Sequence, residues 1–279
     1  MKVAVIQMVS GTDVQSNLAR AHALLNQAAQ AGAELAVLPE YFCLLGQFDA
    51  DKLAIQEPSG DGPIQRFLAN AARELGLWVV GGTVPLSVPV APSGGADAAN
   101  RVFNSTLVFS PQGDCVARYD KIHLFRFDNG REKYDESRVL APGQTPVIFK
   151  LPSQDGHRWR IGLSVCYDLR FAELYRGYAR AGADLLLVPS AFTHTTGQAH
   201  WEVLLRARAI ENLAFVGAAA QGGVHENGRR TWGQSLLIEP WGAVLGELAQ
   251  GEGLVTADLS MTQLQACRAQ LPALEHRVL

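Results

Sequence analysis

The chain has 279 residues, of which 48% are hydrophobic, so it is long enough to bury a substantial core. Its 24 Lys and Arg residues against 27 Asp and Glu residues give a formal net charge of −3, which argues against nucleic acid or an anionic membrane as the main partner. The four cysteines lie far apart, without C-x-x-C or zinc-ligand spacing, so we expect neither a disulfide framework nor a metal site.

The N-terminal residues run directly into an apolar strand, 3–8, which leaves no room for a signal peptide. No apolar run in the sequence approaches the length of a membrane span. We therefore expect a cytoplasmic protein in a reducing environment, where a free thiol stays available for chemistry.

The first part of the chain alternates strands and helices. A helix follows the first strand, with Ser16 or Asn17 as its expected cap, and another begins at Pro63, a favoured first helical position. The second strand ends at Pro39, and Glu40 is the first charged residue after it. The remaining predictions here are strands at 35–38 and 77–84 and a surface loop at 85–99.

Two hairpins follow, each with a polar turn between strand-like runs. The first pairs 103–109 with 115–119 and leads straight to Lys121, and the second pairs 147–151 with 159–165. Between them, residues 126–143 are polar and long enough to favour a lid or binding loop over a passive connector. Beyond the second hairpin, Cys166 is expected at a sharp elbow that leads into a helix at 171–181.

An internal repeat relates the two halves. Residues 31–39 read AGAELAVLP and residues 181–189 read AGADLLLVP, each the end of a helix that leads into a buried strand. A helix at 198–212, strands near 215–220, 234–238, 243–245 and 254–257, and an apolar tail at 261–279 complete the pattern. We predict an α/β fold, a four-layer α-β-β-α sandwich with two mixed sheets and an internal pseudo-repeat.

Glu40, Lys121 and Cys166 each follow a strand-like run, and catalytic groups in α/β proteins gather at the carboxyl ends of strands. These residue types suit acyl transfer. Glu40 would take the thiol proton of Cys166, and Lys121 with the backbone N–H of Tyr167 would stabilise the oxyanion. We expect Lys121→Ala to abolish turnover with little change in thermal stability.

Each of these residues also has an ordinary interpretation. A free Cys is often a buried small hydrophobe, and a Glu or Lys at a strand end is often a solvated charge. His123 or His200 as the base of a Cys–His pair is a further alternative, but it leaves Glu40 and Lys121 without roles. The three residues together are much harder to explain by chance.

Three sequence blocks resemble the signature motifs of the nitrilase, or carbon–nitrogen hydrolase, superfamily. They are VLPE at 37–40, YDKIHLF at 119–125 and VCYDLRF at 165–171, and the likeness extends over essentially the whole chain. The resemblance implies one carbon–nitrogen hydrolase domain over 1–279, no metal or organic cofactor, and a homodimer or higher homo-oligomer with an interface near the helix after Cys166 and the C-terminal segment. It also implies a second catalytic glutamate at Glu136, with Glu132 in the same loop as the alternative.

The run TGQAHWEVLLRARAIE at 196–211 is similar to the deaminated glutathione amidase branch, which implies hydrolysis of deaminated glutathione to 2-oxoglutarate and cysteinylglycine. The alternatives are an omega-amidase acting on 2-oxoglutaramate or 2-oxosuccinamate, a nitrilase, an N-carbamoyl amide hydrolase, and a non-catalytic oligomeric interaction module. His194 departs from the small or apolar residue expected there and affects the expected shape of the pocket.

A keto-acid substrate needs a cation for its carboxylate, and Arg170, Arg206 and Arg208 are the candidates. Arg206 and Arg208 are two residues apart on a predicted helix, so both cannot face one site, and ion-paired helix arginines remain an equal possibility. Aromatic residues are expected to line the pocket or to belong to the core: Phe125, Phe192 and Trp201.

Overall fold

The computed structural model describes residues 1–89 and 101–278. Two large mixed sheets dominate it. The first has the strand order β16-β1-β2-β3-β5-β4, with β6 and β9 also paired to β5, and the second has the order β10-β11-β12-β13-β14-β15. Strands β7 and β8 form a separate two-stranded sheet. The strands are β1 Lys2–Gln7, β2 Leu35–Val37, β3 Trp78–Val80, β4 Val84–Ser87, β5 Val102–Phe109, β6 Cys115–Asp120, β7 Arg126–Asp128, β8 Lys133–Asp135, β9 Leu140–Ala141, β10 Ile148–Pro152, β11 Arg158–Leu163, β12 Leu185–Leu187, β13 Phe215–Ala218, β14 Ser235–Ile238, β15 Val244–Leu248 and β16 Gly253–Asp258.

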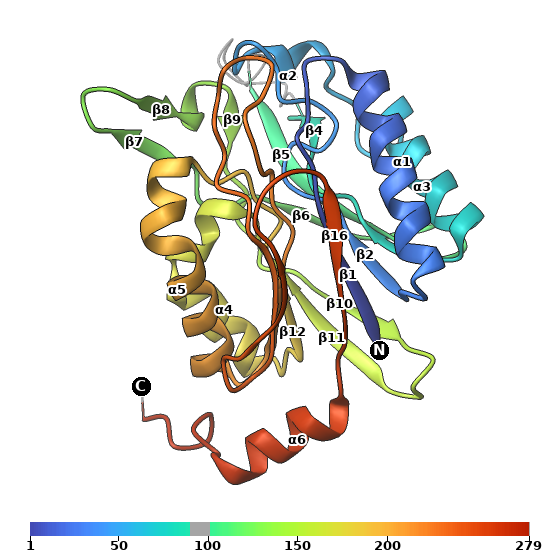
Figure 1. The fold of residues 1–279 in the computed structure, drawn as a ribbon, viewed down its shortest axis with the longest axis vertical. Helices are drawn as coiled ribbons and strands as arrows, with labels where there is room; N and C mark the ends of the chain where they lie inside the picture. The colour runs from blue at the N-terminus through green and yellow to red at the C-terminus, as the bar shows by residue number, and fades with distance from the viewer. Residues whose placement is uncertain (90–100, 279) are drawn as a thin grey trace.

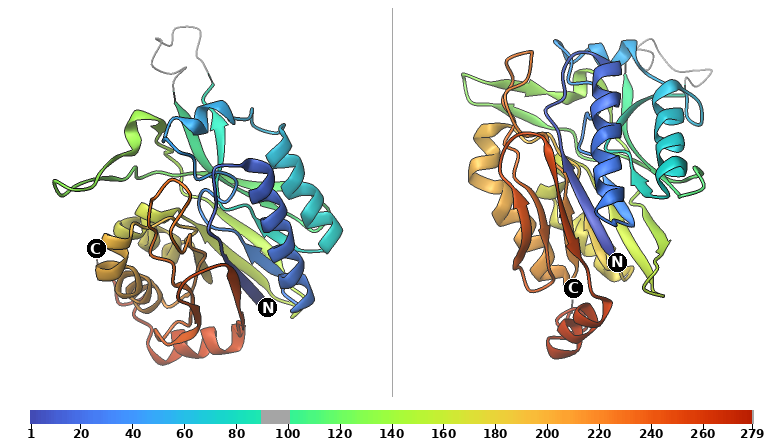
Figure 2. Two further views of the ribbon diagram at one scale, coloured as in Figure 1. Left: turned by 45° about the horizontal axis from the view of Figure 1, so that its top comes forward. Right: turned by 45° about the vertical axis from the view of Figure 1, so that its right-hand side comes forward.

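Helices cover the outer faces of both sheets. Figures 1 and 2 show α1 and α3 against one sheet and the α4–α5 pair against the other, with α6 below them. The helices are α1 Val14–Gln30, α2 Asp51–Ala54, α3 Pro63–Leu75, α4 Ala172–Arg180, α5 His194–Asn212 and α6 Met261–Gln270, with the 3-10 turns η2 Glu136–Arg138 and η3 Cys166–Arg170. The predicted four-layer α-β-β-α sandwich is confirmed.

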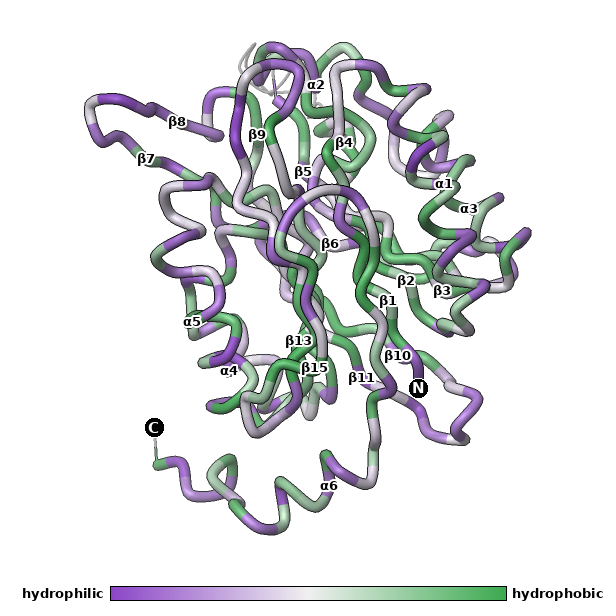
Figure 3. Tube along the Cα trace, in the orientation of Figure 1, coloured by the Kyte–Doolittle hydropathy of each residue, from purple (hydrophilic) through white to green (hydrophobic). Residues whose placement is uncertain are grey.

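The alternation of side chains along the strands produces these layers. In β1, Val3 and Val5 enter the core cluster between the two sheets, whereas Ala4 and Ile6 pack in the cluster beneath α1 and α3. Because both faces of β1 are covered, its central residues 3–6 are apolar without a break. Figure 3 shows the same hydrophobic colouring along the central strands and a largely hydrophilic β7–β8 hairpin.

The internal repeat is visible in the backbone. Strands β1, β2 and β3 are parallel neighbours in the first sheet, as β11, β12 and β13 are in the second. Corresponding residues Glu34 and Asp184 make matching bonds: Glu34 N donates to Lys2 O at 2.9 Å and Asp184 N to Arg160 O at 2.7 Å. Each half therefore delivers the residue after its second strand to the same end of its sheet.

Three local predictions were wrong. Residues 77–84 form the two strands β3 and β4, which β5 separates, because the chain turns at Gly82, where φ is +48° and an added Cβ would lie 2.0 Å from Pro39 O. The predicted loop at 85–99 therefore begins later than expected, since 85–87 belong to β4, and 90–99 lie outside the described residues. The cap of α1 is Asp13, whose carboxylate accepts from Ser16 N at 2.8 Å.

The polar segment 126–143 is not a simple loop. It contains the β7–β8 hairpin, η2 and the short strand β9, so its polar side chains are placed on regular backbone. In the described part of the chain, no helix is both long and apolar enough to cross a membrane.

Candidate active site

Cys166 begins η3, just beyond the end of β11. Its φ of +49° lies in the left-handed region that non-glycine residues seldom adopt, which indicates a strained backbone held by its surroundings. Its N–H donates to Pro189 O at 3.0 Å, which ties the elbow to the end of β12. The residue is only 7% exposed, but it lines a pocket.

The carboxylate of Asp168 holds this elbow in place. Its Oδ2 accepts from Val165 N at 2.8 Å and from the hydroxyl of Tyr119 at 2.7 Å. Its Oδ1 lies 2.7 Å from His123 Nδ1 and accepts from His123 N at 3.0 Å. Because Tyr119 and His123 lie two residues on either side of Lys121, Asp168 connects the elbow to the segment that carries the lysine.

Lys121 lies at the centre of a buried group of charges. Its Nζ is 2.9 Å from Oε1 of Glu40 and 2.8 Å from Oε2 of Glu136. The side chains of Lys121 and Glu40 are 0% and 1% exposed. Buried charges of this kind are stable only when they are paired and hydrogen-bonded, and here all three are.

Further hydrogen bonds orient the two carboxylates. Glu40 accepts from Asn104 Nδ2 at 2.8 Å through Oε1 and from Ala191 N at 2.9 Å through Oε2. Glu136 accepts from the Tyr41 hydroxyl at 2.9 Å and from Phe125 N at 2.7 Å. Glu40 is thus fixed between the ends of the two sheets.

Of the two glutamates in the 126–143 segment, the structure places Glu136 against Lys121. Glu132 instead accepts a 2.7 Å hydrogen bond from the hydroxyl of Thr195 at an exposed position. The sequence did not single out Asn104, Ala191 or Tyr41, because none of these residue types marks a site without its three-dimensional context.

Burial and neighbouring charges alter the pKa values in this group. Burial, then the negative charge of Glu40, raises the pKa of Cys166 well above 9.0, although Lys121 opposes the rise. Burial lowers the pKa of Lys121, but Glu136 and Glu40 outweigh it, so the net shift is upward. Burial raises the pKa of Glu136, but Lys121 and several hydrogen bonds hold it below 4.5. At neutral pH the group therefore consists of a neutral thiol, an ammonium and an ionised Glu136.

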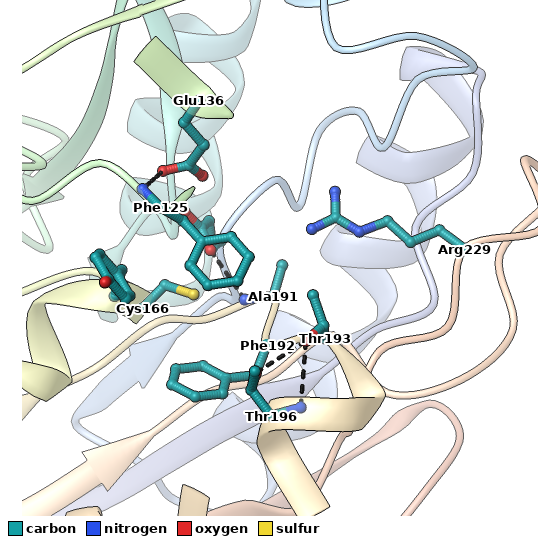
Figure 4. Close-up of a pocket in the computed structure, with 10 residues that line it drawn as sticks. Phe125, Glu136, Cys166, Ala191, Phe192, Thr193, Thr196 and Arg229 are labelled. Carbon is teal, nitrogen blue, oxygen red and sulfur yellow. Dashed lines mark hydrogen bonds between the residues drawn. The ribbon is translucent and has the colours of Figure 1, made fainter. Parts of the chain in front are cut away.

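The pocket beside Cys166 is narrow and mostly apolar at its base. It has a volume of about 10 Å³, and Figure 4 shows the Cys166 sulfur facing the Phe125 ring, with Ala191 and Phe192 below. Its lining residues are Glu40, Phe125, Glu136, Cys166, Tyr167, Ala191, Phe192, Thr193, Thr196 and Arg229.

The remaining sequence candidates do not line this pocket. Arg170 lies 3.2 Å from His200 Nδ1, and Arg206 donates to Gly242 O at 2.9 Å. His194 places its ring edge on Trp232, with 5.3 Å between the ring centres.

Two other expected pocket residues have structural contacts. Arg208 donates to Leu169 O, through Nη2 at 2.7 Å. Trp201 packs beneath Phe192, with 4.8 Å between the ring centres. Among the described residues, no group of three or more His, Cys, Asp or Glu side chains is placed to hold a metal ion.

Two known solved structures share the fold over nearly the whole chain. The NitFhit protein of C. elegans superposes with a TM-score of 0.85 at 33% identity, covering 99% of this chain and 65% of that one. An amidase from Nesterenkonia sp. AN1, solved after Michael addition of acrylamide to its active-site cysteine, superposes with a TM-score of 0.76 at 28% identity and covers 98% of both chains.

Sequence comparison gives the same family. The deaminated glutathione amidase of Synechocystis sp. is 38% identical over 277 residues, covering 99% of this chain and 97% of that protein. The human omega-amidase NIT2 is 33% identical over 277 residues, covering 99% and 94%. The carbon-nitrogen hydrolase family model matches residues 2–269. The chain therefore belongs to the carbon–nitrogen hydrolase family of the nitrilase superfamily and is an amidase that hydrolyses C–N bonds other than peptide bonds.

Proposed function

We propose that this amidase works through a thioester on Cys166. The observation that carries the proposal is the buried chain Glu40–Lys121–Glu136, which borders the same pocket as the thiol. Charges are costly to bury, so an ion-pair chain beside a nucleophile suits catalysis better than stability.

The first half-reaction moves one proton twice. Glu40 takes the proton of the Cys166 thiol as the sulfur attacks the amide carbon, because the raised pKa of Cys166 leaves little free thiolate. Lys121 and the backbone N–H of Tyr167 stabilise the negative oxygen of the tetrahedral intermediate. Glu40 then gives the proton to the leaving nitrogen, the C–N bond breaks, and the acyl group remains on sulfur.

The second half-reaction regenerates the enzyme. Glu40 takes a proton from water as the oxygen attacks the thioester, and Lys121 again faces the developing oxyanion. The C–S bond breaks and the proton returns to sulfur. The sum is one amide and one water converted to one acid and one amine.

We propose deaminated glutathione as the substrate, cleaved to 2-oxoglutarate and cysteinylglycine. The support is the name of the 38% identical Synechocystis relative, against 33% for the human omega-amidase. The second candidate is therefore omega-amidase activity on 2-oxoglutaramate, which shares the acyl group and differs only in the amine released.

The test compares the two substrates and looks for the intermediate. We expect a higher kcat/KM for release of cysteinylglycine than for release of ammonia from 2-oxoglutaramate, and an added acyl mass on the Cys166 peptide after rapid acid quenching. The reverse order of kcat/KM would favour the omega-amidase. Unchanged amide hydrolysis by Cys166→Ala would overturn the thioester mechanism, and Cys115→Ala, at an exposed cysteine, is the matched control.

We also propose that the chain forms a homodimer through α5, rather than through the helix after Cys166 and the C-terminal segment that the family resemblance implies. Val203 and Ile210 are 69% and 47% exposed on this helix, and Trp241, 57% exposed, precedes Gly242, which contacts Ile210. Large apolar side chains that gather on one face often mark an interface. Light scattering should show a dimer for the wild type and a monomer for Ile210→Glu; a monomeric wild type would exclude the proposal.

A further inference from the structure

Arg229 makes no ion pair within 4.0 Å with any residue that the structure describes, although the carboxylates of Asp49 and Glu40 are near enough to favour its charge. It lies in the turn between β13 and β14, and its Nε is buried without a hydrogen-bond partner. An arginine stays charged at any physiological pH, so a buried guanidinium nitrogen without a partner costs free energy unless something else supplies one.

The other arginines near the site are already bound. Arg170 contacts His200, and Arg206 contacts Gly242 and Glu202. Arg208 contacts Leu169 and Glu211. None of the three lines the catalytic pocket, whereas Arg229 does.

The position of Arg229 links two cavities. It lines the narrow pocket of Cys166 and also an outer cavity of about 450 Å³ bordered by Tyr41, Lys52 and Tyr134. Figure 4 shows its guanidinium directed toward the centre of the catalytic pocket, from the side opposite Cys166. A substrate that enters from the outer cavity and reaches the sulfur therefore passes the guanidinium.

The surroundings of the guanidinium include an aromatic ring and carboxylates at longer range, Asp49 and Glu40. The Cζ of Arg229 lies 5.0 Å from the centre of the Tyr134 ring, a cation–π contact that uses none of its N–H donors. Glu40 and Glu136, the carboxylates of the pocket, are both bound by Lys121. The hydroxyls of Thr193 and Thr196, which also line the pocket, are hydrogen-bonded to each other at 2.8 Å.

We propose that Arg229 pairs with a carboxylate of the substrate and makes the enzyme selective for amides that carry one. This inference rests on the proposed amidase function and adds the group that recognises the acid. A guanidinium binds a carboxylate through two parallel N–H···O bonds, and a substrate carboxylate would complete the coordination that the folded chain leaves open. The acyl part is the favoured source, because it stays in the inner pocket while the amine leaves.

The experiment uses matched substrates. The first pair is 2-oxoglutaramate and 4-oxopentanamide, in which a methyl group replaces the carboxylate. The second pair is deaminated glutathione and its glycinamide form, which differ only in the carboxylate of the leaving part. The variants are Arg229→Gln and Arg229→Lys, with Arg230→Gln as control, because Arg230 is the adjacent arginine and is exposed.

We expect Arg229→Gln to lower the acid-to-neutral ratio of kcat/KM by roughly 10- to 100-fold, the loss typical of a charged hydrogen-bond pair. Arg229→Lys should lose less, and Arg230→Gln should keep the wild-type ratio. If the ratio falls only for the first pair, Arg229 binds the carboxylate of the acyl part. If it falls only for the second pair, Arg229 binds the carboxylate of the leaving group. An unchanged ratio in both pairs overturns the proposal.

A binding measurement keeps this test separate from the proposed reaction. Calorimetry with 2-oxoglutarate should show binding to the wild type and to Arg230→Gln and at least 10-fold weaker binding to Arg229→Gln. Equal binding by all three proteins, or no binding to the wild type, would contradict the acyl-carboxylate assignment. If no amide at all is hydrolysed, the proposed function fails, and the calorimetric result still decides for or against Arg229.

Discussion

Lys121 Nζ lies 2.9 Å from Oε1 of Glu40, although the two residues reach this point from different strands of the first sheet. Glu40 follows β2, and Lys121 follows β6. Cys166 approaches from the second sheet, so the site forms only when the two sheets pack face to face. This arrangement makes the charged residues part of the folded core as well as of the chemistry.

Lys121→Ala should therefore cost both activity and stability. The sequence led us to expect little change in thermal stability, but Lys121 is 0% exposed and neutralises two carboxylates. Its removal leaves Glu40 and Glu136 buried without a cation, a change that typically costs about 3–5 kcal/mol. We expect kcat to fall at least about 100-fold through loss of oxyanion stabilisation, and urea unfolding at pH 7 to show the loss of stability.

A double variant separates the two effects. Lys121→Met combined with Glu136→Gln removes one charge of each sign, so it should be more stable than Lys121→Met alone while remaining inactive. Lys150→Met, at an exposed lysine of β10, is the surface control and should change neither property. Wild-type stability in Lys121→Met would show that the ion pairs contribute nothing to the fold.

The reactivity of Cys166 should titrate at high pH. Burial, followed by the charge of Glu40, holds its pKa well above 9.0, so alkylation by iodoacetamide should still be rising at pH 9. Glu40→Gln removes a charge that raises this pKa. We therefore expect the alkylation curve of the variant to move to lower pH while amide hydrolysis is lost, as followed by mass spectrometry of the Cys166 peptide.

The other cysteines provide an internal standard for this titration. Cys115 is exposed, whereas Cys43 and Cys267 are buried, so the Cys115 peptide should be modified equally in the wild type and in Glu40→Gln. A curve for Cys166 that stays in place or moves to higher pH would show that the charge of Glu40 does not act on the thiol.

Sequence patterns predicted most of the fold because its strands are buried on both faces. Runs of apolar or small residues such as 35–38 and 161–165 locate the central strands, and Glu40 and Cys166 follow these runs at the sheet ends. The same patterns failed at 77–84, where an apolar run conceals a turn. Hydrophobicity alone does not reveal that Gly82 packs against the backbone of Pro39.

The part of the site that the sequence did not predict lies on irregular backbone. Arg229 belongs to a polar turn with no periodic pattern, so its approach to the pocket depends on how that turn folds over the sheet ends. Arg206, by contrast, was a candidate because of a helical motif, and the helix directs it to Gly242. Residue type identified the need for a cation, and only the fold identified which arginine lies at the pocket.

Asp168→Asn should loosen the elbow that carries Cys166. The carboxylate accepts from a backbone N–H at each oxygen, and an amide nitrogen cannot accept, so the N–H of Val165 or of His123 loses its acceptor. We expect a loss of about 1–3 kcal/mol in unfolding free energy. We also expect a large decrease in kcat with little change in KM, because Asp168 positions the nucleophile and does not touch the substrate.

Tyr119→Phe is the graded control for this positioning role. It removes one bond to Asp168 and keeps the carboxylate, so its kcat should lie between those of the wild type and Asp168→Asn. A purely structural role would lower the amount of folded enzyme without changing kcat per folded molecule. Active-site titration of Cys166 gives the concentration of competent enzyme and distinguishes these outcomes.

Asp155→Asn should make stability less dependent on acid pH. Asp155 accepts from the Met1 ammonium at 3.0 Å, from His157 N at 2.9 Å and from Trp159 Nε1 at 3.1 Å. Burial raises the pKa of Asp155, but these bonds lower it more, to about 2 against an ordinary value of 3.8. Because the folded pKa is the lower one, the carboxylate contributes stability that is present above pH 3.8 and is lost as the pH falls toward 2.

Urea titrations of the untagged protein from pH 3 to pH 7 measure this contribution. The difference in unfolding free energy between the wild type and Asp155→Asn should be largest near pH 7 and should shrink below about pH 4, as the unfolded state takes up the proton first. Asp258→Asn is the matched control, because that carboxylate is 79% exposed and its ion pair with Lys2 Nζ is long at 3.9 Å. The unfolding free energy of this variant should stay close to that of the wild type at every pH. The opposite outcome is a difference in unfolding free energy between the wild type and Asp155→Asn that does not change with pH. It would mean that the amide replaces the carboxylate in these bonds and that the charge of Asp155 contributes nothing.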